Sequence, residues 1–156
     1  MKFPGFRAIV TLIVAMAVAV LGAACSGGET NGGDADFNPD LFGADPMVPA
    51  ADVLAAYEAG EDIVFVDARP ELDYEFGHIP GARSVPYFEA ESHVDGLPRD
   101  RWLVTYCECP HAEAQQVADV LTANGFEHVK IISDGLPGWR EAGGPEGAGT
   151  PEGAEG

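Results

Sequence analysis

Three short runs of apolar, mostly β-branched residues, separated by longer stretches with helical spacing, constrain the fold of this 156-residue chain most strongly. The runs cover residues 63–66, 103–106 and 129–132. Runs of this length and composition are typical of buried strands in a parallel sheet. Because the strands alternate with helices, we expect an α/β fold with a central, mainly parallel sheet and helices on both faces.

Two stretches have the pattern of helices. Between the second and third runs, apolar residues recur at spacings i, i+3, i+4 and i+7, and Gly125 follows them as a stop signal. An earlier stretch from Pro49 to Tyr57 also predicts a helix, which Gly60 ends.

A polar residue follows each apolar run at the point where the expected strand ends. Asp67 follows the first run, Cys107 the second and Ser133 the third. Sites in open parallel sheets form beyond the carboxyl ends of the strands. Cys107 therefore occupies a position suited to chemistry.

The first 25 residues have the layout of a secretory signal. Lys2 and Arg7 precede an uncharged stretch that ends in small residues directly before Cys25. This end resembles a bacterial lipobox, in which the cysteine carries lipid, although Gly22 stands where that pattern prefers leucine. We expect an extracytoplasmic lipoprotein, anchored through Cys25 on the periplasmic side of a membrane. Cleavage after Ala24 to a secreted soluble form, or retention as an uncleaved anchor of about 18 uncharged residues, stays open.

Composition divides the rest of the chain. Residues 26–45 are rich in Gly, Asp and Asn and predict a flexible linker. Residues 144–156 are of low complexity and predict a disordered tail. A single folded domain is expected over residues 46–143, as a monomer.

The formal net charge of −18 bears on partners. Lys and Arg supply the attraction to nucleic-acid phosphates and to anionic lipids, so neither is expected to bind this chain. Contact with a membrane is expected through the N-terminal lipid alone.

Several short motifs follow one another along the folded region. The chain has Val66-Asp67-Ala68-Arg69, then Gly77-His78-Ile79-Pro80-Gly81-Ala82, then Tyr106-Cys107 and Asp134-Gly135-Leu136-Pro137-Gly138-Trp139. The folded region therefore resembles a rhodanese-like domain of the sulfurtransferase superfamily.

The resemblance implies that Cys107 is the nucleophile. Loop N–H groups and a helix N-terminus around such a cysteine favour the thiolate and lower the pKa of the thiol. The cysteine would take sulfur from a small donor or a protein persulfide, hold it as a persulfide and pass it to a thiol, without a cofactor. Asp67 and Arg69 would organise the loops near the site through hydrogen bonds and an ion pair.

The loop Cys107-Glu108-Cys109-Pro110-His111 departs from the usual rhodanese loop, which carries basic residues and glycine and ends in arginine. Glu108 and Glu113 repel anions at short range, which makes thiosulfate an unfavourable donor. Glu113 also stands where phosphatases related to this fold require arginine. Phosphate chemistry is therefore not expected.

The Cys-x-Cys-Pro variant leaves alternatives open. Cys109 could resolve an oxidised Cys107, which would make the chain a thiol-disulfide redox protein, or it could be an incidental thiol. Loss of the basic loop favours a catalytically inactive binding module. Cys107, Cys109 and His111 are ligand types that suit zinc or copper, but three ligands within five residues form a poor tetrahedral site, and no metal is expected. His111 is otherwise the only group in the loop that gains positive charge near neutral pH.

Overall fold

Five parallel strands form the centre of the domain in this structure, a computed structural model that describes residues 37–108 and 111–150. Their order is β1-β5-β4-β2-β3, and each neighbouring pair is parallel. The strands are β1 (Met47–Val48), β2 (Ile63–Asp67), β3 (Arg83–Ser84), β4 (Trp102–Tyr106) and β5 (Val129–Ile132). The parallel sheet and its three predicted strands are confirmed.

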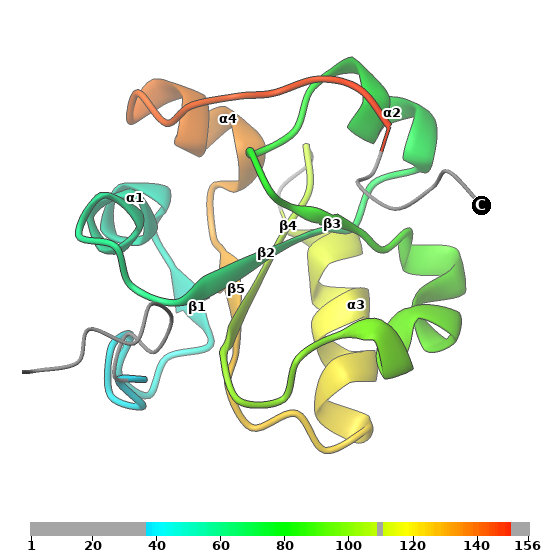
Figure 1. Cartoon of the computed structure of the whole chain (residues 1–156), viewed down its shortest axis with the longest axis horizontal. Coiled ribbons are helices and arrows are strands. Elements are labelled where there is room, and N and C mark those ends of the chain that lie inside the picture. Colours follow the sequence, from blue (N-terminus) through cyan, green and yellow to red (C-terminus); the bar gives the residue numbers. More distant parts are fainter. Residues whose placement is uncertain (1–36, 109–110, 151–156) are drawn as a thin grey trace, which may run out of the picture. The chain divides into compact units, whose positions relative to one another are not determined.

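Helices cover both faces of this sheet, as expected. They are α1 (Ala50–Glu58), α2 (Glu71–Phe76), the 3-10 segment η1 (Tyr87–Gly96), α3 (Ala112–Ala123) and α4 (Gly135–Glu141). Helices α1 and α4 lie on one side of the sheet and α3 on the other (Figure 1). The two helices predicted from spacing correspond to α1 and α3.

Strand β4 lies between β2 and β5, and all of its residues are buried. Because side chains alternate along a strand, Val104 and Tyr106 join the core under α1 and α4, whereas Leu103 and Cys107 join the core under α3. Phe65, Phe126 and Trp139 are also buried.

Residues 37–45 lie against the domain, so the prediction of a flexible linker up to residue 45 is wrong for this part. Phe37, Leu41 and Phe42 pack against the core. The ring of Phe42 meets that of Trp102 edge to face, with 5.3 Å between ring centres. These three apolar side chains are enough to hold a polar segment on the domain because they pack against an apolar surface. Residues 26–36 lie outside the described residues.

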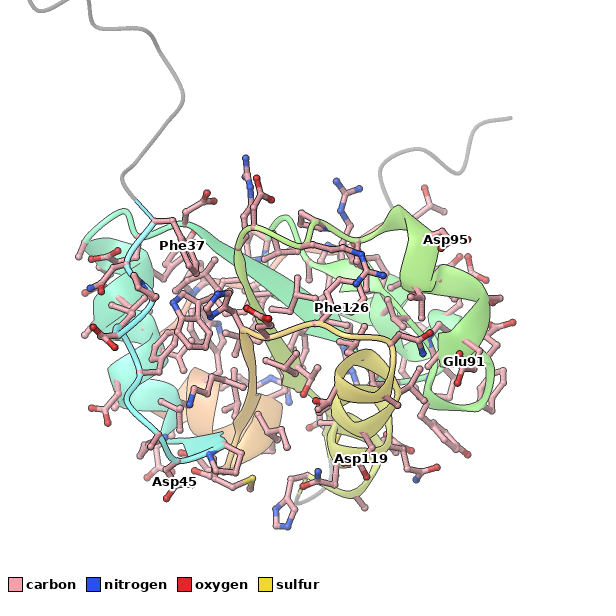
Figure 2. All side chains as sticks on the ribbon, turned by 90° about the horizontal axis from the view of Figure 1, so that it is seen from below. Phe37, Asp45, Glu91, Asp95, Asp119 and Phe126 are labelled. Atoms are coloured by element: carbon pink, nitrogen blue, oxygen red, sulfur yellow. The ribbon has the colours of Figure 1, made fainter. Side chains whose placement is uncertain are left out.

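The side chain of Lys130 binds the backbone of the same segment. The Nζ atom donates to the carbonyl oxygens of Gly43 and Asp45, at 2.7 Å each. Burial lowers the pKa of Lys130. Phe37 and Asp45 lie on the opposite side of the sheet from Asp119 of α3 (Figure 2).

The C-terminal strap, residues 143–150, is also held by the domain, which contradicts the predicted disorder from residue 144 for the part that the structure describes. Trp139 Nε1 donates to Pro145 O at 2.9 Å. The backbones of His78 and Gly147 exchange two hydrogen bonds of 2.9 and 2.8 Å. Composition misleads here because backbone groups, not apolar side chains, attach most of the strap. The strap runs from α4 across to α2 (Figure 1).

No helix within the described residues is long and apolar enough to cross a membrane. The predicted signal sequence, with Cys25, lies outside these residues.

Candidate active site

Cys107 directly follows β4, and its side chain is fully buried. Its carbonyl oxygen accepts a hydrogen bond of 2.9 Å from the backbone N–H of Leu136, at the start of α4. The side chain belongs to the core that α3 covers, together with Ala114 from the first turn of that helix. Cys107 is thus held where β4, α3 and α4 converge.

Two neighbours of Cys107 strengthen this junction. Thr105 Oγ1 lies 3.1 Å from the carbonyl oxygen of Ala114 and 3.2 Å from that of Lys130, so it links β4 to α3 and β5. Tyr106 Oη accepts a hydrogen bond of 3.1 Å from Ile79 N. Burial, and next the charge of Asp67, raise the pKa of Tyr106 and keep it neutral.

Helix α3 begins after His111, whose backbone has a φ of 49°. Among the residues that the structure describes, His111 is the single non-glycine residue with positive φ. A left-handed backbone is uncommon for a residue with a Cβ and is often found at functional loops. The carbonyl oxygen of His111 accepts the first helical hydrogen bond from Gln115 N, whereas its exposed side chain does not cap the helix.

Asp67 and Arg69 form the expected ion pair in the interior. Arg69 Nη2 lies 2.6 Å from Asp67 Oδ2, and Nε lies 2.9 Å from Oδ1. The same Nη2 donates to Gly77 O at 2.6 Å. Burial opposes the charge of Arg69, but Asp67 outweighs it and raises the pKa of Arg69. Arg69 therefore stays charged, and its contacts join the end of β2 to the end of α2.

Glu108, which follows Cys107, lies between two arginines. Arg140 Nη1 donates to Glu108 Oε1 at 2.5 Å, and Arg69 Nη1 lies 3.5 Å from Glu108 Oε2. Arg140 Nε also donates to Glu146 of the strap, at 2.9 Å. Burial lowers the pKa of Arg140, but the hydrogen bonds to Glu108 and Glu146 outweigh it and raise that pKa.

Arg140 is a site residue that was not predicted from the sequence. The loop itself contains Glu108 and no Arg or Lys, and Arg140 comes from α4, 32 residues further along the chain. The one available signal is the position of Arg140 directly after the Gly-Trp pair of the resemblance, at the end of the sheet where Cys107 lies.

A cleft of about 580 Å³ opens beside Glu108, between α2, α4 and the strap. It carries two arginines and three carboxylates. Its lining residues are Arg69, Asp73, Phe76, Gly77, Glu108, Arg140, Glu146, Gly147 and Ala148. A second hollow of about 640 Å³ lies beside β3 and η1, but neither Cys107 nor Glu108 lines it. The charged cleft is lined by Glu108, the neighbour of Cys107, whereas Cys107 itself lines neither hollow.

Two of the expected site residues fall outside the described part of the chain, namely Cys109 and the lipidation residue Cys25. The pairing of Cys107 with Cys109 therefore stays a prediction. Within the described residues, no group of three or more His, Cys, Asp or Glu side chains is placed to hold a metal ion. His78 is stacked on Tyr74, with 3.8 Å between ring centres.

The parallel sheet, the cysteine after its central strand and the buried Asp67–Arg69 pair define a single α/β domain with a thiol site. A family model described as "Rhodanese-like domain" matches residues 50–142. The chain belongs to this family.

The relatives include a transcriptional regulator and sulfurtransferases. An HTH-type transcriptional regulator of Mycobacterium tuberculosis is 35% identical over 115 residues, which cover 73% of this chain and 50% of the regulator. The chain thus spans about half the length of that relative. A sulfurtransferase of Allochromatium vinosum is 31% identical over 85 residues, which cover 54% of this chain and 78% of that protein.

Solved structures share the fold. The solution structure of a rhodanese-like domain from Anabaena sp. has a TM-score of 0.61 and 28% identity, covering 67% of this chain and 80% of that one. The crystal structure of thiosulfate sulfurtransferase from Pseudomonas aeruginosa has a TM-score of 0.56 and 27% identity, covering 67% of this chain and 20% of that one.

Proposed function

We propose that the chain is an extracytoplasmic rhodanese-like sulfurtransferase that carries sulfur on Cys107 as a persulfide and passes it to a thiol acceptor. The observation that carries the proposal is the place of Cys107, after the central strand and before the loop that leads into α3, in a domain of this family. The Allochromatium vinosum relative, named a sulfurtransferase, supports the same class of reaction.

The reaction consists of two nucleophilic displacements at sulfur. The Cys107 thiolate attacks the outer sulfur of a persulfide donor, R–S–SH. A bond forms between the two sulfurs, the donor S–S bond breaks, and its electron pair leaves with R–S⁻, which takes up a proton. An acceptor thiolate then attacks the outer sulfur of the Cys107 persulfide, and the Cys107 thiolate is regenerated. The cycle needs no external oxidant or reductant.

Access to Cys107 controls the first step. The side chain has an exposed fraction of 0%, so a donor reaches the sulfur only after neighbouring groups move. A donor presented by a protein, or a small donor already bound in the cleft beside Glu108, suits this arrangement better than a donor that arrives directly from solution.

Intact mass measurement tests the proposal. The reduced full-length chain is exposed in turn to thiosulfate and to glutathione persulfide, and is then weighed. We expect a gain of one sulfur atom with the persulfide, and transfer of that sulfur to added thiol. Cys107→Ser should abolish the gain, whereas Cys109→Ser, the matched control in the same loop, should retain it. Absence of any sulfur gain from either donor, while the Cys107 thiol still titrates after unfolding, would contradict the proposal.

The complete burial of Cys107 favours a second candidate, a binding module without turnover. The same measurement separates the two functions, because a module of this kind gains no sulfur. It also tests the redox alternative, in which mild oxidant removes two hydrogens from the wild-type chain but not from either single cysteine variant.

The extracytoplasmic location is proposed from the first 25 residues, with lipid carried on Cys25. Growth of a bacterial host that expresses the chain with a labelled fatty acid should label the wild-type protein and leave Cys25→Ser unlabelled. Label in both proteins, or in neither, would contradict lipidation at Cys25.

A further inference from the structure

The carboxylate of Glu108 bridges two guanidinium groups that come from different elements of the fold. Arg140 Nη1 donates to one of its oxygens at 2.5 Å, and Arg69 Nη1 lies 3.5 Å from the other. The side chain of Glu108 itself is half exposed. A group open to solvent thus occupies the space between two cations at the edge of the cleft.

Both arginines are held in place by partners other than Glu108. Arg69, with a side-chain exposed fraction of only 6%, is bound to Asp67 and to the carbonyl of Gly77. Arg140 is bound through Nε to Glu146 of the strap. Arg69 is therefore fixed independently of Glu108, and Arg140 has a second partner in Glu146.

Paired guanidinium groups bind carboxylates and other oxyanions strongly, because several charged N–H donors converge on planar or tetrahedral oxygens. Glu108 directly follows Cys107, so the space that its carboxylate occupies belongs to the loop that begins at Cys107.

We propose that Arg69 and Arg140 form an anion-binding site for sulfur donors, and that Glu108 occupies this site and keeps anionic donors out. The ligand class is a small sulfur donor that carries a carboxylate or sulfur oxyanion, such as thiosulfate. The inference rests on the proposed function insofar as the donor reacts with Cys107, whereas binding of the anion is independent of that reaction.

The carboxylate of Glu108 competes effectively with free anions because it is covalently attached beside the two arginines. Its effective concentration at the site is on the order of millimolar or higher, so a free donor at lower concentration does not displace it. Glu108 is then a specificity residue, since it selects donors by charge and leaves the sulfur chemistry unchanged.

Persulfides of matched size test the selection by charge. The persulfides of mercaptoacetate, 2-mercaptoethanol and cysteamine carry an anionic, a neutral and a cationic group beside the same reacting sulfur. Rates of sulfur gain at Cys107 are measured in the reduced full-length chain by intact mass. We expect Glu108→Gln to raise the rate for the anionic donor and for thiosulfate by about tenfold or more, with about twofold change or less for the neutral donor.

Two further variants separate occupation of the site from a general change in charge. Glu127→Gln removes the same charge from an exposed position that does not line the cleft, and should change the ratio of anionic to neutral rates by about twofold or less at physiological salt. Adding Arg140→Gln to Glu108→Gln should reverse most of the gain. Equal effects of Glu108→Gln and Glu127→Gln on that ratio would overturn the proposal.

A binding measurement distinguishes failure of this inference from failure of the proposed function. Thiosulfate is titrated calorimetrically into the full-length Cys107→Ser chain, with and without Glu108→Gln. We expect binding at least about tenfold tighter in the double variant, and loss of that gain with Arg140→Gln.

The outcomes separate the two proposals. If no variant gains sulfur but thiosulfate binds in this pattern, the proposed reaction is wrong and the proposed anion site is supported. If Cys107 gains sulfur but Glu108→Gln changes neither binding nor donor preference, the anion site fails and the reaction stands. Glu108→Ser serves as a second variant should the first not fold.

Discussion

At the scale of single residues, the Asp67–Arg69 pair is the most consequential buried contact of the site. The exposed fractions of the two side chains are 0% and 6%. Removing one member of such a pair leaves the other charge buried without compensation, which costs more than the pair itself contributes.

We therefore expect Arg69→Met to lower the free energy of unfolding by about 3–5 kcal/mol. Urea unfolding followed by circular dichroism measures this change. Arg101→Met is the matched control, because the pair of Arg101 with Asp62 is partly exposed and its loss should cost about 1 kcal/mol or less. Similar losses of stability in both variants would show that the buried pair contributes no more to stability than the partly exposed one.

Glu113 provides a prediction on pH. Burial, and next the carboxylates of Asp73 and Asp67, raise its pKa. A carboxyl group whose pKa is higher in the folded state favours folding below its ordinary value of about 4.3 and loses this contribution as pH rises through the folded value. Glu113→Gln should therefore raise the melting temperature at pH 7, and this gain should vanish by about pH 3.5. Glu127→Gln, which removes an exposed charge outside the site, controls for net charge. A gain in Tm for Glu113→Gln that is constant with pH would refute the prediction.

At the scale of elements, the C-terminal strap depends on contact between Gly144 and the buried ring of Trp139. A Cβ atom at residue 144 would lie 2.2 Å from Trp139 Cε2, and the ring has no space to retreat because it is fully buried. The same ring supplies the hydrogen bond to Pro145 that begins the strap. This close approach requires glycine.

Gly144→Ala is expected to destabilise the domain by about 1–3 kcal/mol and to detach the strap. Hydrogen exchange should then accelerate at the paired backbone amides of His78 and Gly147, and urea unfolding measures the loss of stability. Gly96→Ala, where a Cβ atom meets nothing within 4 Å, should leave exchange at these amides unchanged. Unaltered protection of Gly147 in Gly144→Ala would mean that the strap is held without Trp139.

At the scale of the whole molecule, acidic side chains outnumber basic ones and the net charge is −18, so like charges repel one another in the folded chain. Raising the concentration of NaCl from about 0.01 M to 0.5 M shortens the distance over which exposed charges interact from about 30 Å to a few Å. We expect the melting temperature to rise by a few degrees, as measured by differential scanning calorimetry. A flat or falling dependence on salt would indicate that favourable ion pairs, such as that of Arg140 with Glu108, outweigh the general repulsion.

The strands, the two longer helices and the place of Cys107 follow from sequence because each depends on residues that are neighbours along the chain. Alternation fixes which face a strand residue joins, and helical spacing fixes the apolar side of α3. The Asp67–Arg69 pair is equally local, since the two residues are separated by one position at the end of a strand. The short elements β1, β3 and α4 have too few residues to show a period.

Only the tertiary structure decided what surrounds Glu108, what holds the strap and why residues 37–45 pack against the domain. The contacts that matter there join residues far apart in sequence: Arg140 to Glu108 across 32 positions, and Lys130 to Gly43 across 87. Charges and hydrogen bonds act over distance in space, so a loop that looks purely acidic in the sequence is neutralised by an arginine from another element. The sequence thus determined that a cysteine follows the central strand, whereas the fold determined which charged side chains surround the loop that begins at this cysteine.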